Sequence, residues 1–165
     1  MASINTFKDM YLAELAELHD AETQQAEALQ RWMGVAQHDG LKKALHKHLE
    51  ETQSQRDRLA RLLQGHGVNP GMHKDQAISA LLHESEKMKE ILSSPDLTDA
   101  GLIASAQRIE HYEIAGYGTV ATYASVLGLK EDQATLHDIL EEEKAADGRL
   151  TALAKSAVNP DAAAA

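Results

Sequence analysis

Hydrophobic and polar residues are distributed along most of the chain with the period of an α-helix. Apolar side chains recur at every third or fourth position over five stretches, which predict helices at about residues 5–37, 41–65, 75–93, 98–127 and 131–157. Runs of β-branched residues are missing, and alanine and leucine supply most of the 43% hydrophobic content. The pattern therefore predicts an all-α fold.

Polar and glycine-rich segments predict where these helices begin and end. Thr6 and Asp9 have the spacing of a capping box at the start of the first helix, and Gly128 fits the position after the fourth. The break at residues 38–40 is so short that the second helix must fold back beside the first, whereas residues 65–71 have the composition of a turn. Two helical hairpins joined by a long crossover with its own helix predict a four-helix bundle with a fifth helix outside it.

The apolar faces of three predicted helices contain carboxylates. Glu113 lies on the apolar line of the fourth stretch, with Glu110 one step to its side. Glu22 and Glu143 lie on the corresponding lines of the first and last helices, and Asp147 follows one turn after Glu143. An ionised carboxylate removed from water costs several kcal/mol, whereas a whole domain is stable by only about 5–15 kcal/mol. These acids therefore predict a cation, or a cationic side chain, inside the bundle.

The second helix adds two further candidates, His48 just beside its apolar line and Glu51 further round. All these groups lie at mid-helix and would meet at one level, where so many like charges either take up protons or gather divalent cations. Oxygen-rich ligation with few histidines suits a pair of iron or manganese ions, although zinc and magnesium also remain open. The candidate metal ligands are Glu22, His48, Glu51, Glu110, Glu113, Glu143 and Asp147.

A second interpretation of the same acids needs no metal. Rotated helices would let them reach water, or pair with Arg56, which lies on the apolar line of its helix, or with Lys144. One guanidinium neutralises one or two acids but not five, which favours the metal. For His48 the alternative role is hydrogen-bonded packing, and helical spacing favours core packing for Tyr117.

Composition and charge narrow the classes of function. The 16 Lys and Arg residues against 26 Asp and Glu give a net charge of −10, the wrong sign for binding a phosphate backbone, so we expect no nucleic-acid partner. Cysteine is absent, which rules out thiolate metal sites and suits a reducing cytoplasm. No signal peptide and no membrane-spanning stretch are predicted, so we expect a soluble, cytoplasmic protein. One domain at residues 1–158 would precede a frayed tail at 159–165.

Several blocks of sequence resemble the YciE/YciF family of ferritin-like bacterial proteins. The blocks are Ala21-Glu22, His48-Leu49-Glu50-Glu51-Thr52, Glu110-His111-Tyr112-Glu113-Ile114-Ala115, and Leu140-Glu141-Glu142-Glu143-Lys144 with Asp147. The resemblance covers roughly residues 5–157 and the blocks occur in the family's order. It implies a ferritin-like four-helix bundle, homodimers, a rubrerythrin-like dinuclear metal centre and an association with bacterial stress responses.

One departure from the wider ferritin-like pattern concerns nitrogen ligands. Di-iron bundles usually carry Glu-x-x-His on two helices. Here the residue three positions after Glu51 is Ser54, and the residue three positions after Glu143 is Ala146. His48-x-x-Glu51, in which the histidine precedes the glutamate instead of following it, would supply one imidazole. Fewer nitrogen ligands leave two hypotheses open: a dimetal stress protein with oxidase-like or peroxidase-like activity, and a non-catalytic dimeric bundle whose metal is structural or absent. Storage in a hollow shell is a weaker third.

Overall fold

The computed structural model describes residues 4–165, which form five long helices and three short helical segments with no strand among them. The long helices are α1 (Phe7–Val35), α2 (Asp39–Gly65), α3 (Gln76–Ile91), α4 (Pro95–Val126) and α5 (Lys130–Leu153). The short segments are η1 (Pro70–Met72), η2 (Ala154–Val158) and α6 (Asn159–Ala164). In this described part of the chain, no helix is both long and apolar enough to cross a membrane. The predicted all-α fold is confirmed.

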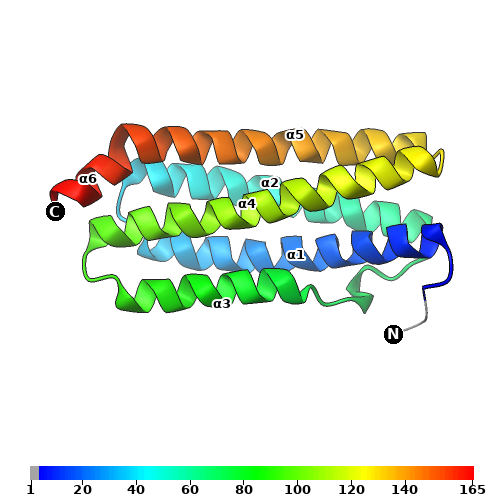
Figure 1. Cartoon of the computed structure of the whole chain (residues 1–165), viewed down its shortest axis with the longest axis horizontal. Helices are drawn as coiled ribbons and strands as arrows, with labels where there is room; N and C mark the ends of the chain where they lie inside the picture. The colour runs from blue at the N-terminus through cyan, green and yellow to red at the C-terminus, as the bar shows by residue number, and fades with distance from the viewer. Residues whose placement is uncertain (1–3) are drawn as a thin grey trace.

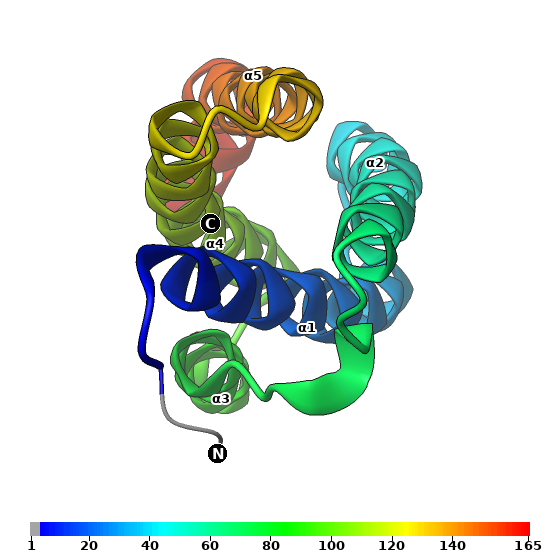
Figure 2. The same cartoon turned by 90° about the vertical axis from the view of Figure 1, so that its right-hand side faces the viewer.

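Four of the long helices form a bundle and the fifth lies outside it. α1 packs against α2, and α4 packs against α5, as two helical hairpins that lie lengthwise beside each other in Figure 1. Seen from the end of the bundle, α3 lies on the outside, where it contacts α1 and α4 (Figure 2). The crossover that carries η1 and α3 joins the two hairpins. This arrangement confirms the predicted four-helix bundle with an additional helix on a long crossover.

Local sequence signals account for two of the helix ends. The Thr6 backbone N–H donates to Asp9 Oδ2 at 2.9 Å and the Asp9 N–H donates to Thr6 Oγ1 at 3.0 Å, so the predicted capping box is present. Gly128 lies just beyond the end of α4 with a φ of 71°, the left-handed conformation that glycine adopts without strain. Both expectations are confirmed.

The C-terminal tail differs from the expectation that it frays from residue 159. Residues 159–164 instead continue the last helix as α6, after the π-helical turns of η2, and α6 packs against α4. Pro160 lacks the N–H that a continuous α-helix would use, and the wider turns of η2 accommodate this gap. The alanines that follow have high helix propensity, which favours the extra turn.

A buried carboxylate of α4 fixes the loop between α1 and α2. Asp99 is 2% exposed and accepts hydrogen bonds from the backbone N–H of Gln37 at 2.9 Å and of His38 at 2.6 Å. The His38 ring in turn accepts from the Gly40 N–H at 3.1 Å and caps the start of α2. Asp99 therefore ties the first hairpin to the second at this end of the bundle.

Replacement of Asp99 should destabilise the fold without touching the interior of the bundle. Asp99→Ala leaves two backbone donors without their acceptor, and we expect a loss of about 1–3 kcal/mol in the free energy of unfolding. Urea denaturation monitored by circular dichroism measures this loss. Asp96→Ala changes an exposed acid in the first turn of α4, three residues before Asp99; it is the control and should cost about 0.5 kcal/mol. Equal losses for the two variants would contradict the assigned role.

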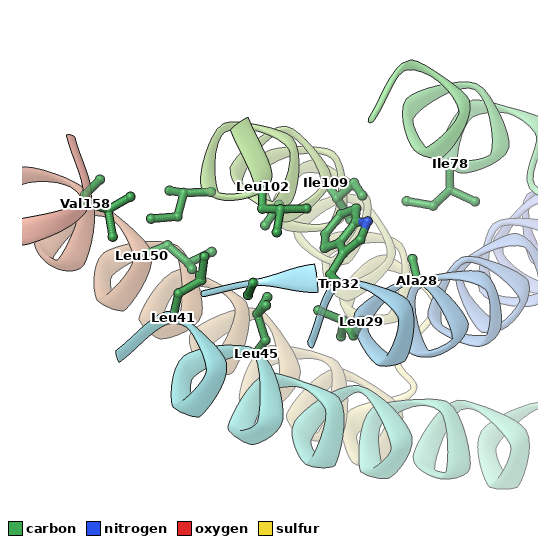
Figure 3. Packing of buried hydrophobic residues seen from close by; sticks show 14 of the residues in the cluster. Ala28, Leu29, Trp32, Leu41, Leu45, Ile78, Leu102, Ile109, Leu150 and Val158 are labelled. Atoms are coloured by element: carbon green, nitrogen blue, oxygen red, sulfur yellow. The ribbon is translucent and has the colours of Figure 1, made fainter. Parts of the chain in front are cut away.

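The interior of the bundle is divided into two hydrophobic clusters. The first lies toward the α1–α2 loop, and its members include Trp32, Leu41, Leu45, Leu102 and Leu150, packed as shown in Figure 3. The second lies toward the α4–α5 connection, and its members include Tyr11, Leu15, Leu59, Tyr117 and Leu136. Each of the four bundle helices contributes to both clusters. The stretch of each helix between them is where polar residues enter the core.

Candidate metal centre

A layer of buried polar side chains separates the two hydrophobic clusters. On α1, Leu15 and Leu18 belong to one cluster and Ala28 and Leu29 to the other, and Glu22 lies between these pairs. The other three bundle helices have the same order of apolar, polar and apolar residues, so the polar positions meet at one level. The layer consists of Glu22 and Gln25 from α1, His48, Thr52 and Gln55 from α2, Glu110 and Glu113 from α4, and Glu143 from α5, each at most 4% exposed.

Three side chains of this layer are arranged as metal ligands would be. His48, Glu110 and Glu143 each offer one ligand atom, and these atoms all lie within 4.8 Å of one another. Two ligands of one ion, each at about 2.0–2.2 Å, lie at most about 4.4 Å apart. Small side-chain adjustments would therefore bring all three within reach of one cation. The residues present fit a metal ion on this criterion.

The carboxylate oxygens of the layer have almost no hydrogen-bond donors. In the part of the chain that the structure describes, both oxygens of Glu110, Glu113 and Glu143, and one oxygen of Glu22, have no hydrogen-bond partner. Glu110 Oε1 lies 2.9 Å from His48 Nε2, but the two atoms are not aligned as donor and acceptor. Native interiors pair the large majority of such atoms. Six oxygens without a partner, and a seventh whose contact is the His48 imidazole, therefore indicate a site built for something positively charged.

Burial and mutual repulsion shift the ionisation of these groups. Burial raises the pKa of Glu22 to about 8. It also raises the pKa of Glu113 and of Glu143 well above the usual range, and in both cases the nearby Glu22 carboxylate adds to the rise. For His48, burial alone would lower the pKa, but the neighbouring Glu110 carboxylate outweighs burial and raises it. Without a bound cation, the layer therefore retains protons at neutral pH.

The cationic side chains considered as alternative partners lie elsewhere. Arg56 pairs with the adjacent Asp57 at 3.0 Å, and its side chain is 35% exposed. Lys144 pairs with Glu141 at 2.8 Å on the surface. Neither reaches the buried acids, so the metal-free explanation of these carboxylates by Arg56 or Lys144 does not hold in this structure.

Five of the seven predicted ligands lie in the buried layer, and the structure places Glu51 and Asp147 outside it. Glu51 is paired with Arg149 and lies 3.5 Å from Lys47 Nζ, and its side chain is 21% exposed. Asp147 accepts a hydrogen bond from Gln107 Nε2 at 2.9 Å and is equally exposed. Both residues are one step off the apolar line of their helices, and Arg149 and Gln107 hold their carboxylates at the partly exposed rim of the bundle. Their prediction as members of the buried group is corrected accordingly.

Four members of this environment were not predicted as site residues. Gln25 Nε2 lies 3.0 Å from His48 Nε2. The hydroxyl of Tyr117 donates a hydrogen bond to Glu22 Oε1, although helical spacing had predicted only a packing role for this residue. Thr52 and Gln55 are the other two. Gln25 follows Glu22 by three residues, Tyr117 follows Glu113 by four, and Thr52 follows His48 by four, so helical spacing from a candidate ligand was the available signal. Gln55 follows the candidate ligand Glu51 by four residues and so carries the same signal.

Comparisons with known proteins match nearly the whole chain. The family model described as "Domain of unknown function (DUF892)" matches residues 6–163. Protein YciF of Escherichia coli (strain K12) is 37% identical over 161 residues, which are 97% of each chain. The solved structure of the E. coli stress protein YciF has a TM-score of 0.89 and covers 94% of this chain and 99% of its own. The solved structure of YcfI from Rhodopseudomonas palustris has a TM-score of 0.87 at 35% identity and covers 91% of this chain and 96% of its own.

Proposed function

The chain belongs to the family described as domain of unknown function DUF892, and from this membership and the buried acids we propose that it is a ferritin-like, dinuclear metal-binding stress protein. The observation that carries the proposal is the set of carboxylate oxygens without hydrogen-bond partners in the polar layer. The similarity to the E. coli stress protein YciF supports the physiological part. A rubrerythrin-like centre, a homodimer and a cytoplasmic location belong to the same proposal.

Charge balance supports two ions rather than one. The four buried glutamates of the layer carry four negative charges when ionised, and two divalent cations carry four positive ones. Glu22, His48, Glu110, Glu113 and Glu143 would hold the pair. Four carboxylates with a single imidazole favour iron or manganese over zinc, which prefers tetrahedral sites richer in nitrogen or sulfur.

The side chains around the layer have definite tasks in such a centre. Tyr117 donates to one oxygen of Glu22 and thereby fixes the direction of the other. His48 directs Nε2 toward Glu110 Oε1 at 2.9 Å and Gln25 Nε2 at 3.0 Å, so a cation bound to this nitrogen would take the place of the contact with Gln25. The hydrophobic clusters above and below exclude water. Iron or manganese bound there would supply Lewis-acid and one-electron redox chemistry, which is the basis for an oxidase-like or peroxidase-like activity.

A second candidate function is a metal site that stabilises the bundle without turnover. The specific observation in its favour is the single imidazole, because α5 carries Ala146 where di-iron bundles usually place a second histidine. Oxygen uptake after addition of ferrous iron separates the two functions. Catalysis gives continued uptake as iron is supplied, whereas a structural site gives none above that of a Glu113→Gln variant.

Metal stoichiometry tests the proposal directly. We expect metal-free protein incubated anaerobically with ferrous iron or Mn²⁺ and then desalted to retain two ions per chain in elemental analysis. Glu113→Gln and Glu143→Gln should each retain fewer, because each removes a charged ligand from the layer. Glu141→Gln, an exposed acid on the same helix as Glu143, is the matched control and should retain two. Wild type that retains no more metal than Glu113→Gln would refute the metal centre.

A further inference from the structure

The seam between α2 and α5 differs from the other helix contacts around the polar layer. These two helices belong to different hairpins, and two arginine–carboxylate pairs join them, Arg149 with Glu51 and Arg58 with Glu142. On the opposite side of the layer, between α1 and α4, Leu18 packs so closely on Gly116 that an added Cβ would lie 2.8 Å from Leu18 Cδ2. The α1–α4 side has a hollow whose lining includes Glu14, Glu17 and Gly116, whereas at the α2–α5 seam the polar groups extend inward to His48 of the buried layer.

A small hollow lies directly beneath one of the two pairs. It has a volume of about 10 Å³, the room of one water molecule, and Ala44, His48, Ala106, Ala146 and Arg149 are among its lining residues. Leu45 and Leu150 complete the lining, so three of the seven lining residues are alanines and only His48 and Arg149 are polar. Arg149 lines the hollow and also binds Glu51, so the Arg149–Glu51 pair lies between the hollow and solvent and is here called its cover.

Glu51 connects this cover to the buried layer. Its Oε2 lies 3.8 Å from His48 Nδ1, and that nitrogen is buried and has no hydrogen-bond partner within residues 4–165. The other side of Glu51 faces Lys47, whose side chain is 56% exposed. One carboxylate therefore reaches from the solvent-exposed rim to the imidazole whose second nitrogen faces Glu110.

We propose that Glu51 and Arg149 form the entrance through which divalent cations reach the buried layer. In the closed state Arg149 neutralises Glu51 and covers the hollow. When the pair opens, Arg149 turns into solvent, and the freed Glu51 carboxylate receives the incoming cation and passes it to His48, Glu110 and Glu143. Glu51 thus acts during transit and is not a resident ligand. This inference rests on the proposed metal centre.

The rate of metal uptake tests this entrance separately from the metal centre. Metal-free protein is mixed with Co²⁺ in a stopped-flow instrument, and the visible absorbance of bound cobalt gives the rate and the final amount. Arg149→Leu should accelerate uptake, and also removal by EDTA, about five- to tenfold, because it removes the pair that keeps the entrance closed. Glu51→Gln should slow uptake by a similar factor with the final stoichiometry unchanged.

The second arginine–carboxylate pair of the seam supplies matched controls. Arg58→Leu and Glu142→Gln break a pair between the same two helices, and neither residue lines the hollow. Both should leave the uptake rate within about twofold of wild type. Equal rates in all four variants, or a Glu51→Gln protein that binds less metal at equilibrium, would overturn the entrance. Absence of cobalt binding by the wild type would instead refute the metal centre itself.

Discussion

Metal-free protein should melt at a lower temperature at pH 8 than at pH 5, and bound metal should reverse this order. Burial raises the pKa of Glu22 from 4.5 to about 8 and raises those of Glu113 and Glu143 well above their usual value. The folded state therefore holds protons that the unfolded state releases above about pH 4.5. Stability is lost as the pH rises from 4.5 through the folded-state pKa values, at up to about 1.4 kcal/mol per pH unit for each group.

The remaining titrating groups do not mask this trend. His48 also has a raised folded-state pKa, so its contribution is complete below pH 6.5 and is lost at higher pH, in the same direction. The exposed acids Glu84 and Glu141 have lowered pKa values because lysines pair with them. Their contribution changes only below about pH 4.5, outside the range of the experiment. His19 is the exception, because burial lowers its pKa and its contribution therefore rises with pH up to about 6.5, against the trend. A fall in melting temperature between pH 5 and pH 8 must therefore come from groups with raised pKa values, chiefly those of the buried layer.

Metal should replace the protons, so its effect should grow with pH. Two divalent cations would neutralise the four buried glutamates, and binding would then release protons and become tighter as the pH rises. Free metal at about 1,000 times the dissociation constant would add about 4 kcal/mol per site. Differential scanning calorimetry at pH 5, 6.5 and 8, with Mn²⁺ or with EDTA, measures both effects. A metal-free melting temperature that rises between pH 5 and pH 8 would contradict the assignment of raised pKa values.

The helical period predicted most of the fold and the centre of the candidate site. A residue on the apolar line of a helix is directed at the core whatever the neighbouring helices are, because the backbone alone sets its direction. Glu22, Glu113 and Glu143 lie on such lines, and all three are fully buried. Glu110, one step to the side, is buried as well because α4 is enclosed on that face too.

Side chains at the edge of an apolar line depend on partners that periodicity does not reveal. The side chains of Glu51 and Asp147 could point either into the bundle or toward solvent. Arg149 on α5 binds Glu51 at the rim, and Gln107 on α4 does the same for Asp147. Tyr117 has the spacing of a packing residue, yet its hydroxyl finds a carboxylate on another helix. Such contacts depend on the register of one helix against another, which follows from the assembled bundle.

Glu113→Gln should make the metal-free protein more stable at pH 8 while reducing its capacity for metal. Both Glu113 oxygens are buried and, although Gln25 is near enough to lower the pKa slightly, neither oxygen accepts a well-formed hydrogen bond within residues 4–165. Ionisation or proton uptake therefore costs free energy. Glutamine has nearly the same shape, carries no charge, and brings an amide that can donate to the neighbouring carboxylates. We expect a gain of about 2–4 kcal/mol at pH 8 and almost none at pH 5, where the native carboxyl is already protonated.

Metal should reverse the order of the two proteins, and this reversal distinguishes a binding site from a poorly packed core. The loaded wild type retains two cations among its carboxylates and should melt above loaded Glu113→Gln, although it melts below that variant in EDTA. Glu141→Gln, which changes an exposed acid paired with Lys144, should follow the wild type in both conditions. Calorimetry of the three proteins at pH 8 decides the matter. A Glu113→Gln protein that is less stable than wild type in EDTA would mean that Glu113 has a stabilising partner in the folded protein, and the reason for placing metal in the layer would be lost.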